Sequence, residues 1–329
     1  MGRTILQTHD LIKRYGDFTA LKRVSLSLYE GDIYGLVGRN GAGKTTFFKC
    51  VMGLARPNSG SIVIGEAGDK LNAARHRMGF MINASFFPYL GPRESLEYLC
   101  RVKKIPARRE EVTRLLKLVE LDTVKKPFKT FSQGMKQRLG IAGALLGSPS
   151  IVVLDEPING LDPQGIADIR DIIKSAHQVS GATFIISSHI LSELDLVATR
   201  FGFIEQGVLL REITHEELHA QTKKSLTLRV SDAVRAQALL QSQPGGIQVS
   251  SSGDCLTIES HLDEPQLISR MVVEGGIELF EMRHAQTTLE DYFIHLIRTA
   301  EAAGLTNGED GSGLTNRSGK KGRRGAHYA

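Results

Sequence analysis

The stretch Ile33-Tyr34-Gly35-Leu36-Val37-Gly38-Arg39-Asn40-Gly41-Ala42-Gly43-Lys44-Thr45 decides the fold of this chain. Its first five residues are an apolar run that predicts a buried strand. Its last eight fit the pattern G-x-x-x-x-G-K-[ST], and we expect a helix to follow them, from about residue 43 to 54. The alternative is a chance glycine-rich turn, which this order of strand, loop and helix disfavours.

The chemistry of such a loop is the binding of a triphosphate. Glycines allow successive backbone N–H groups to face the phosphates, and the start of the helix adds positive potential. We expect Lys44 to contact the β- and γ-phosphates of ATP and Thr45 to bind Mg²⁺. The predicted nucleotide-binding residues of the loop are Gly38, Asn40, Gly41, Ala42, Gly43, Lys44, Thr45 and Thr46.

A second apolar run, Ile151–Leu154, ends in Asp155 and Glu156. Acidic residues at the carboxyl end of a buried strand lie where ligands bind in α/β sheets. We expect Asp155 to hold Mg²⁺ through water and Glu156 to accept a proton from the attacking water. Two surface acids at a strand end are the alternative, which the phosphate loop disfavours.

A third segment, Phe131-Ser132-Gln133-Gly134-Met135, opens a predicted helix over residues 133–146. Ser132 is a favourable N-cap, and Gly134 follows it closely. The segment predicts a second helix N-terminus suited to an anion. An ordinary capped helix is an equally good reading of this segment taken alone.

Composition restricts the function classes. The net charge is +5, but residues 316–329 contain five basic and no acidic residues, so the remainder is neutral. Tryptophan is absent and aromatic residues make up 6%, so we expect no specific nucleic-acid partner. Three cysteines in no metal-binding pattern indicate reduced thiols, and we expect a cytoplasmic protein without a signal peptide. With no apolar run of about 18 residues, any membrane span must come from a partner.

The alternation of strands and helices up to about residue 222 indicates an α/β fold with a mostly parallel central sheet. Four short strand patterns and two helical patterns between residues 223 and 298 predict a small C-terminal α/β domain, accessory or regulatory in role. Its last helix begins at Thr287-Thr288-Leu289-Glu290, a capping-box spacing. We expect residues 299–329 to be a disordered basic tail.

The order of these three motifs resembles the ATP-binding cassette (ABC) family over residues 3–222. The resemblance implies a P-loop NTPase of ABC type, with antiparallel β and helical subdomains, that binds and hydrolyses ATP. It identifies Ser132, Gln133 and Gly134 as the signature motif, which contacts the γ-phosphate bound by a partner subunit. By the same resemblance Tyr15 stacks on adenine, Asp162 lies in the loop linking two active sites, and His189 is the switch histidine.

Three positions depart from the family pattern. Phe131-Ser132-Gln133-Gly134-Met135 stands in place of L-S-G-G-Q, although the serine and the second glycine are kept. Asn83 is the nearest equivalent of the family's glutamine, which binds Mg²⁺, and is one methylene shorter. Ile158 occupies a place that threonine often fills. None of these changes removes a group essential to hydrolysis.

One cassette per chain implies a homodimer that closes head to tail on ATP. We expect the ATPase subunit of an exporter with a separately encoded permease, peripheral on the cytoplasmic face of the membrane. Soluble ABC ATPases that act on ribosomes are the alternative, but they resemble tandem cassettes. Chromosome and DNA-repair ATPases need a long coiled coil, which residues 46–131 do not contain.

Two segments narrow the resemblance further. The segment of residues 81–99, MINASFFPYLGPRESLEYL, and the sequence Thr288-Leu289-Glu290-Asp291-Tyr292-Phe293 resemble the bacitracin/daunorubicin-type ATPases. The resemblance implies a permease of ABC-2 type and substrates such as antibiotics, peptides, lipids or polysaccharides. Phe86, Phe87, Tyr89 and Leu90 are candidates for docking the permease, with core packing as an equally good alternative.

Overall fold

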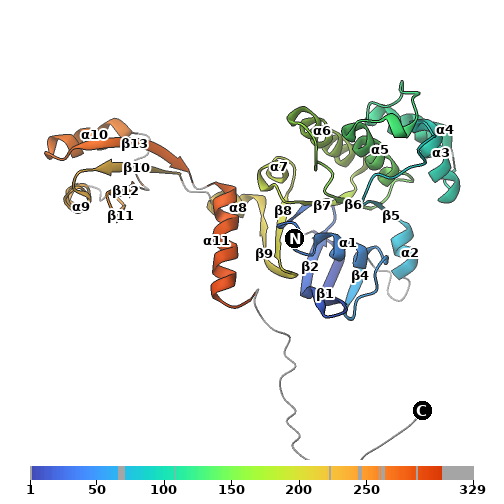
Figure 1. The fold of residues 1–329 in the computed structure, drawn as a ribbon, viewed down its shortest axis with the longest axis horizontal. Helices are drawn as coiled ribbons and strands as arrows, with labels where there is room; N and C mark the ends of the chain where they lie inside the picture. The colour runs from blue at the N-terminus through green and yellow to red at the C-terminus, as the bar shows by residue number, and fades with distance from the viewer. Residues whose placement is uncertain are drawn as a thin grey trace, which may run out of the picture.

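The structure is a computed structural model. It describes residues 2–65, 71–106, 108–221, 224–243, 247–258, 260, 264–286 and 288–305, and the basic tail predicted from the sequence lies mostly outside these ranges. Figure 1 shows a large body that contains the phosphate loop, called the cassette below, and a smaller four-stranded body, called the appendage. Within the described residues, no helix combines the length and apolar character needed to cross a bilayer.

The central sheet of the cassette has six strands, which are parallel apart from β9, antiparallel to β8. In spatial order they are β5 (Met78–Met81), β6 (Ile151–Asp155), β7 (Thr183–Ser188), β3 (Ile33–Val37), β8 (Arg200–Glu205) and β9 (Val208–Thr214). Every residue of β3, β6 and β7 is buried, as expected of parallel strands that are covered on both faces. The parallel sheet expected from the sequence is confirmed.

An antiparallel sheet and two helices cover one face of the central sheet (Figure 1). The antiparallel sheet has the order β2 (Phe18–Tyr29), β1 (Thr4–Tyr15), β4 (Ser59–Ile64), and the helices are α1 (Lys44–Val51) and α2 (Leu71–His76). Buried side chains of β1, β2 and α1 form one hydrophobic cluster with alternate residues of the central strands, such as Val153.

Helices cover the opposite face. They are α3 (Pro92–Val102), α4 (Arg108–Leu118), α5 (Gln133–Leu145), α6 (Pro163–Ser180) and the short α7 (Leu191–Asp195), with a 3₁₀ turn at Phe128–Thr130. Their apolar residues form a second cluster with the other face of the strands, such as Leu154. Two predicted helices within residues 92–120 are confirmed by α3 and α4.

The chain leaves the cassette after α8 (His215–Gln221) and builds the appendage. Its antiparallel sheet has the order β11 (Val249–Ser252), β12 (Cys255–Ile258), β10 (Lys224–Val230), β13 (Leu279–Gln286). Helices α9 (Ala233–Gln241) and α10 (Pro265–Glu274) pack on it, and the appendage has a hydrophobic cluster of its own. One of the four predicted strand patterns, at residues 247–249, overlaps β11 only at Val249, where that strand begins.

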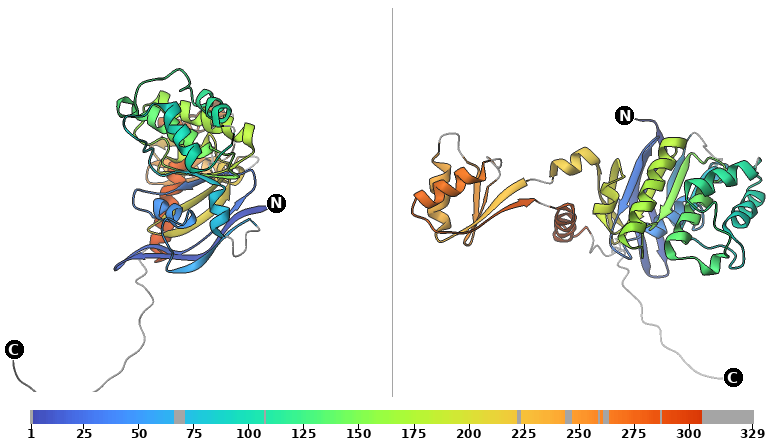
Figure 2. Two further views of the ribbon diagram at one scale, coloured as in Figure 1. Left: turned by 90° about the vertical axis from the view of Figure 1, so that its right-hand side faces the viewer. Right: turned by 90° about the horizontal axis from the view of Figure 1, so that it is seen from above.

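The last helix, α11 (Leu289–Ala302), returns to the cassette, and Figure 2 shows it between the two bodies. Thr288 and Asp291 form a capping box at its start, one residue later than the Thr287–Glu290 spacing predicted from the sequence. Phe293 and Tyr292 are buried against Phe203 of β8, with ring centroids 5.5 and 5.7 Å from that of Phe203. The helix extends to Ala302, so residues 299–302, which the sequence analysis assigned to the disordered tail, are helical.

The docking of α11 predicts a specific loss of stability. Phe293→Ala should lower the free energy of unfolding of the cassette by about 3 kcal/mol, because it empties a buried aromatic site beside Phe203. Ile294→Ala, a neighbouring change at a side chain that is 40% exposed, is the matched control. Chemical unfolding of the full chain measures both, and similar small losses would show that α11 does not pack as described.

Candidate functional site

The phosphate loop has a shape that requires glycine. At Gly43 φ is +109°, and a Cβ there would lie 2.7 Å from the carbonyl oxygen of Ala20 on β2. A Cβ on the buried Gly38 would lie 2.3 Å from the carbonyl oxygen of Ile204. The loop therefore runs against the backbone of two neighbouring strands, which fixes its path.

The remaining loop residues predicted from the sequence differ in exposure. Ala42 is buried, and its carbonyl accepts from the backbone N–H of Gly207 over 2.9 Å. Asn40 and Gly41 are exposed at the tip, and Thr46 is half-buried in the first turn of α1. The tip is thus open to a ligand while its base is fixed by β8 and the turn after it.

Lys44 lies across the loop with its ammonium group held from three sides. Nζ donates to the carbonyl oxygens of Gly38 and Arg39, over 2.6 and 3.1 Å, and is 3.0 Å from Oε1 of Glu156. The side chain is only 5% exposed. A buried ammonium paired with a carboxylate places a positive charge at the base of the loop, where a phosphate oxygen can exchange for the carboxylate.

Asp155 is fixed through both carboxylate oxygens. Oδ2 accepts from the hydroxyl of Thr45 over 2.6 Å, and Oδ1 accepts from the hydroxyl of Ser187 over 2.6 Å. Ser187 lies directly opposite Asp155 in the parallel pairing of β6 and β7, and opposite Leu36 of β3. The structure therefore brings together Thr45 and Asp155, two of the three predicted metal ligands.

Glu156 and His189 form the next layer of the site. His189 Nδ1 is 3.0 Å from Oε2 of Glu156, and the backbone N–H of Glu156 donates to the Ser187 hydroxyl over 2.9 Å. Glu156 has φ +48°, a conformation unusual for a residue with a side chain. This turn directs the carboxylate toward both Lys44 and His189, the other two predicted catalytic residues.

The sequence did not single out Ser187. Its hydroxyl links the carboxylate of Asp155 to the backbone of Glu156. Only part of the signal is present in the sequence: Ser187 ends the mostly apolar segment 183–187, but its partners depend on strand register.

Asn83 follows β5, which pairs with β6, so it leaves the same edge of the sheet as Asp155. It is exposed, and the contacts described for Asp155 and Thr45 do not include it. Tyr15 ends β1, is 48% exposed, and has Lys13 Nζ 4.7 Å from its ring centroid. It belongs to the β1–β2 hairpin, whose Ala20 contacts the phosphate loop.

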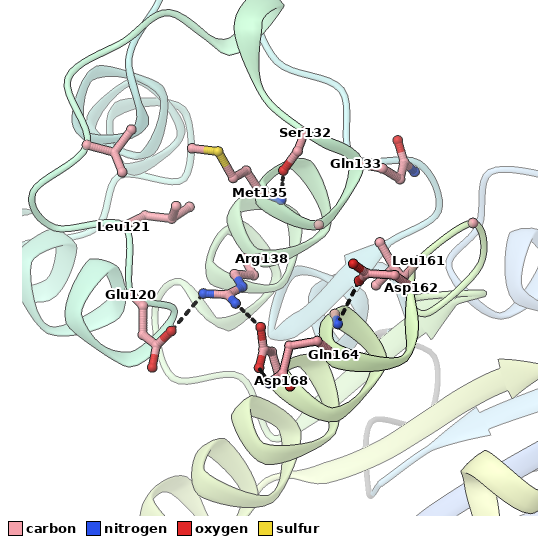
Figure 3. A pocket seen from close by; sticks show the side chains of 14 residues that line it. Glu120, Leu121, Ser132, Gln133, Met135, Arg138, Leu161, Asp162, Gln164 and Asp168 are labelled. Atoms are coloured by element: carbon pink, nitrogen blue, oxygen red, sulfur yellow. Dashed lines mark hydrogen bonds and ion pairs between the residues drawn. The ribbon is translucent and has the colours of Figure 1, made fainter.

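The signature segment forms a separate hollow, shown in Figure 3. Ser132 caps α5 by accepting from the Met135 N–H over 3.3 Å, and Asp162 caps α6 by accepting from the Gly165 N–H over 2.9 Å. Gln133 and Gly134 line the hollow together with Gly160 and Leu161, and no residue of the phosphate loop lines it.

Arg138, which the sequence did not single out, fixes the two helices that bound this hollow. It pairs with Glu120 after α4 over 2.7 Å and with Asp168 of α6, whose carboxylate also accepts from Gln164 over 2.8 Å. Figure 3 shows Arg138 between the carboxylates of Glu120 and Asp168. The two helix N-termini are therefore held in a fixed relation.

Comparison with known proteins agrees with this geometry. The profile of the ABC transporter family matches residues 21–159. The bacitracin transport ATP-binding protein BcrA of Bacillus licheniformis is 37% identical over 89% of this chain and 97% of its own length. The daunorubicin resistance ATP-binding protein DrrA3 of Streptomyces coeruleorubidus is 31% identical over 92% of this chain and all of its own.

Solved structures of ABC ATPases are similar to this chain. CbiO1 of Clostridium perfringens has a TM-score of 0.60 at 26% identity, and covers 67% of this chain and 92% of its own. The dimeric cassette MJ0796, bound to ADP and Pi in a post-hydrolysis state, has a TM-score of 0.58 at 25% identity over 64% of this chain and 99% of its own.

The fold and the site define a P-loop ATPase of the cassette type. The chain belongs to the ABC transporter family. Within that family it is an ATP-binding, ATP-hydrolysing subunit. The fold class and family expected from the sequence are confirmed.

Ser187 provides a test of the site geometry. Ser187→Ala should lower steady-state ATPase turnover, because Asp155 loses one of its two fixed contacts and the Glu156 N–H loses its acceptor. We also expect a loss of about 1–3 kcal/mol in unfolding free energy, the usual effect of leaving buried groups unpaired. Ser192→Ala, at an exposed serine of α7, is the control. Equal turnover in the two variants would contradict the bridging role.

Proposed function

We propose that this chain is the ATPase of an exporter, that it closes as a head-to-tail homodimer on ATP, and that it drives an ABC-2 type permease. The observation that carries the proposal is the separation of two half-sites. The phosphate loop belongs to the side of the sheet that carries α1, whereas Ser132 and Asp162 cap helices on the opposite side (Figure 1). A second copy is the simplest source of the missing half.

In this proposal each residue of the site has a defined role. Lys44 binds the β- and γ-phosphates, Glu156 takes the proton of the attacking water, and His189 orients Glu156 through the contact at Nδ1. Tyr15 stacks on adenine. The N-terminus of α5, with Ser132, Gln133 and Gly134, approaches the γ-phosphate held by the other subunit.

Mg²⁺ fits the donor set of Thr45 and Asp155. Their oxygens, Oγ1 and Oδ2, lie 2.6 Å apart beside the phosphate loop, and oxygen donors are those that Mg²⁺ prefers. When bound, the ion supplies charge that offsets the negative charge on the β- and γ-phosphates. Asn83 is proposed as a further ligand, because it leaves the same sheet edge as Asp155.

The catalytic assignment is tested at Glu156. Glu156→Gln should lower ATP turnover by about 100-fold or more, because an amide cannot accept the proton, while ATP binding is kept. The variant should elute as an ATP-dependent dimer in size-exclusion chromatography with light scattering. Glu281→Gln, at an exposed carboxylate of the appendage, should behave like the unchanged chain. Normal turnover in Glu156→Gln would refute the role of the carboxylate, and a persistent monomer would refute the closure on ATP.

The relatives favour the exporter over a soluble ATPase acting on ribosomes. The names of the two relatives described above are those of bacitracin transport and daunorubicin resistance proteins. They match this chain over nearly their whole length, so the match extends into the appendage of this chain. We infer that the chain works at the cytoplasmic face of the membrane and that its permease is a separate protein. The exported substrate belongs to the antibiotic, peptide, lipid or polysaccharide classes.

The proposed permease contact lies between β5 and α3. Phe87 and Tyr89 are 41% and 70% exposed, and Phe87 packs on both Tyr89 and the exposed Tyr98, with centroids 5.8 and 5.0 Å apart. Phe86 instead packs against Phe128 in the core. Of the four candidates from the sequence, Phe87 and Tyr89 are therefore the proposed docking residues. Phe86 packs in the core, and Leu90 is half-buried.

Phe87→Ala with Tyr89→Ala should remove permease binding without lowering the ATPase activity of the free subunit, because both side chains lie outside the nucleotide site. Co-expression with the proposed permease partner, detergent extraction and affinity purification measure the stoichiometry. Val179→Ala, at a 74% exposed side chain of α6, is the control for loss of exposed apolar surface. Co-purification at the unchanged ratio in the double variant would place the contact elsewhere.

A further inference from the structure

Two histidines and an aspartate converge where the chain leaves the cassette. Asp195 is the last residue of α7, and His215 and His219 lie one turn apart on α8. Asp195 Oδ1 is 2.8 Å from Nε2 of His219 and 3.4 Å from Nε2 of His215. One ligand atom from each of the three side chains can be chosen so that all three lie within 4.8 Å of one another.

The backbone of α8 is held firmly enough to define this cluster. Thr214 and Glu217 cap the start of the helix reciprocally, over 2.9 and 3.2 Å, and Leu218 is completely buried in the cassette core. The ring of His215 stacks on Phe201, with centroids 6.3 Å apart. The two imidazoles are thus presented on one face of an anchored helix.

The ligand chemistry is that of a transition metal. Two imidazole nitrogens four residues apart on a helix, with one carboxylate, form a set that suits Zn²⁺, which binds such atoms at about 2.0–2.2 Å. The three ligand atoms lie within 4.8 Å of one another, a spacing that can accommodate such an ion. Asp195 is 14% exposed and the histidines are 42 and 44% exposed, so a fourth position faces solvent.

The surroundings also favour a cation. The neighbouring hollow is lined by three acidic residues, Asp32, Asp195 and Glu216. Among the described residues that line it, Arg200 is the one arginine or lysine. The carboxylate of Asp32 lies 3.9 Å from the guanidinium of Arg200, so Asp32 offsets part of the positive charge of Arg200.

We propose that Asp195, His215 and His219 bind a divalent transition metal ion, with Zn²⁺ the preferred ion, and that the ion ties α8 to the end of α7. Helix α7 begins two residues after His189, and α8 is the last element before the appendage. Helix α11 packs on both, and Glu290 accepts from the Ser192 N–H of α7 over 3.2 Å. The ion would therefore join α8, from which the chain enters the appendage, to α7, the segment that follows His189.

A direct titration tests the site. The full chain, free of any affinity tag and nucleotide, is titrated with Zn²⁺ against a chromophoric chelator in excess Mg²⁺. We expect one tight site per chain, weakened at least about 10-fold in the His215→Ala/His219→Ala double variant. The His9→Ala/His284→Ala variant removes two exposed histidines away from the cluster and should bind as the unchanged chain does.

A second measurement keeps the proposal falsifiable if the alanine variant folds poorly. Asp195→Asn nearly preserves side-chain volume and should lose most of the Zn²⁺-dependent rise in Tm, which follows from binding to the folded state alone. Co²⁺ should give intense visible absorption in the unchanged chain and in His9→Ala/His284→Ala, and weak absorption in Asp195→Asn. If the cluster variants bind Zn²⁺ as tightly as the control, or the unchanged chain shows no tight site, the triad is a hydrogen-bonded network and the proposal is overturned.

Discussion

The nucleotide site depends on one constraint, the parallel alignment of β6, β7 and β3 at their carboxyl ends. This register places Ser187 between Asp155 and Leu36, so one hydroxyl can join the Asp155 carboxylate to the backbone of Glu156. Asp155 in turn accepts from Thr45 at the start of α1, and Glu156 meets Lys44 and His189. A shift of one residue in any of these pairings would turn alternate side chains to the opposite face and separate the groups.

The same sheet explains why the phosphate loop and the signature segment, the two halves of the composite site proposed above, lie apart within one chain. Alternate side chains of β6 belong to different hydrophobic clusters, Val153 with α1 and Leu154 with α5. The phosphate loop is therefore built into one layer and the signature helix into the other. Arg138, paired with Glu120 and Asp168, fixes the helices around the signature as one unit. Rigid halves of this kind suit closure between two copies better than a rearrangement within one.

The C-terminal third of the chain is connected to the cassette in more than one place. The appendage has its own core, yet α11 returns to bury Phe293 against Phe203 and to contact α7 and α8. The cluster of Asp195, His215 and His219 lies at that junction. Packed side chains and hydrogen bonds thus connect α8, which leads into the appendage, with α7, which follows His189.

The sequence by itself determined the features whose residues lie close together along the chain. The strand, the glycine-rich loop and Lys44 lie within a few residues of one another, as do Asp155 and Glu156 at the end of their strand and Ser132 at its helix cap. Only the tertiary structure decided which distant residues meet. Ser187 joins the site through strand register, α11 docks on the cassette rather than on the appendage, and Asp195 meets two histidines of α8. The reason is physical: a motif is defined by spacing along the chain, whereas these contacts depend on how separate elements pack, and no local pattern specifies that packing.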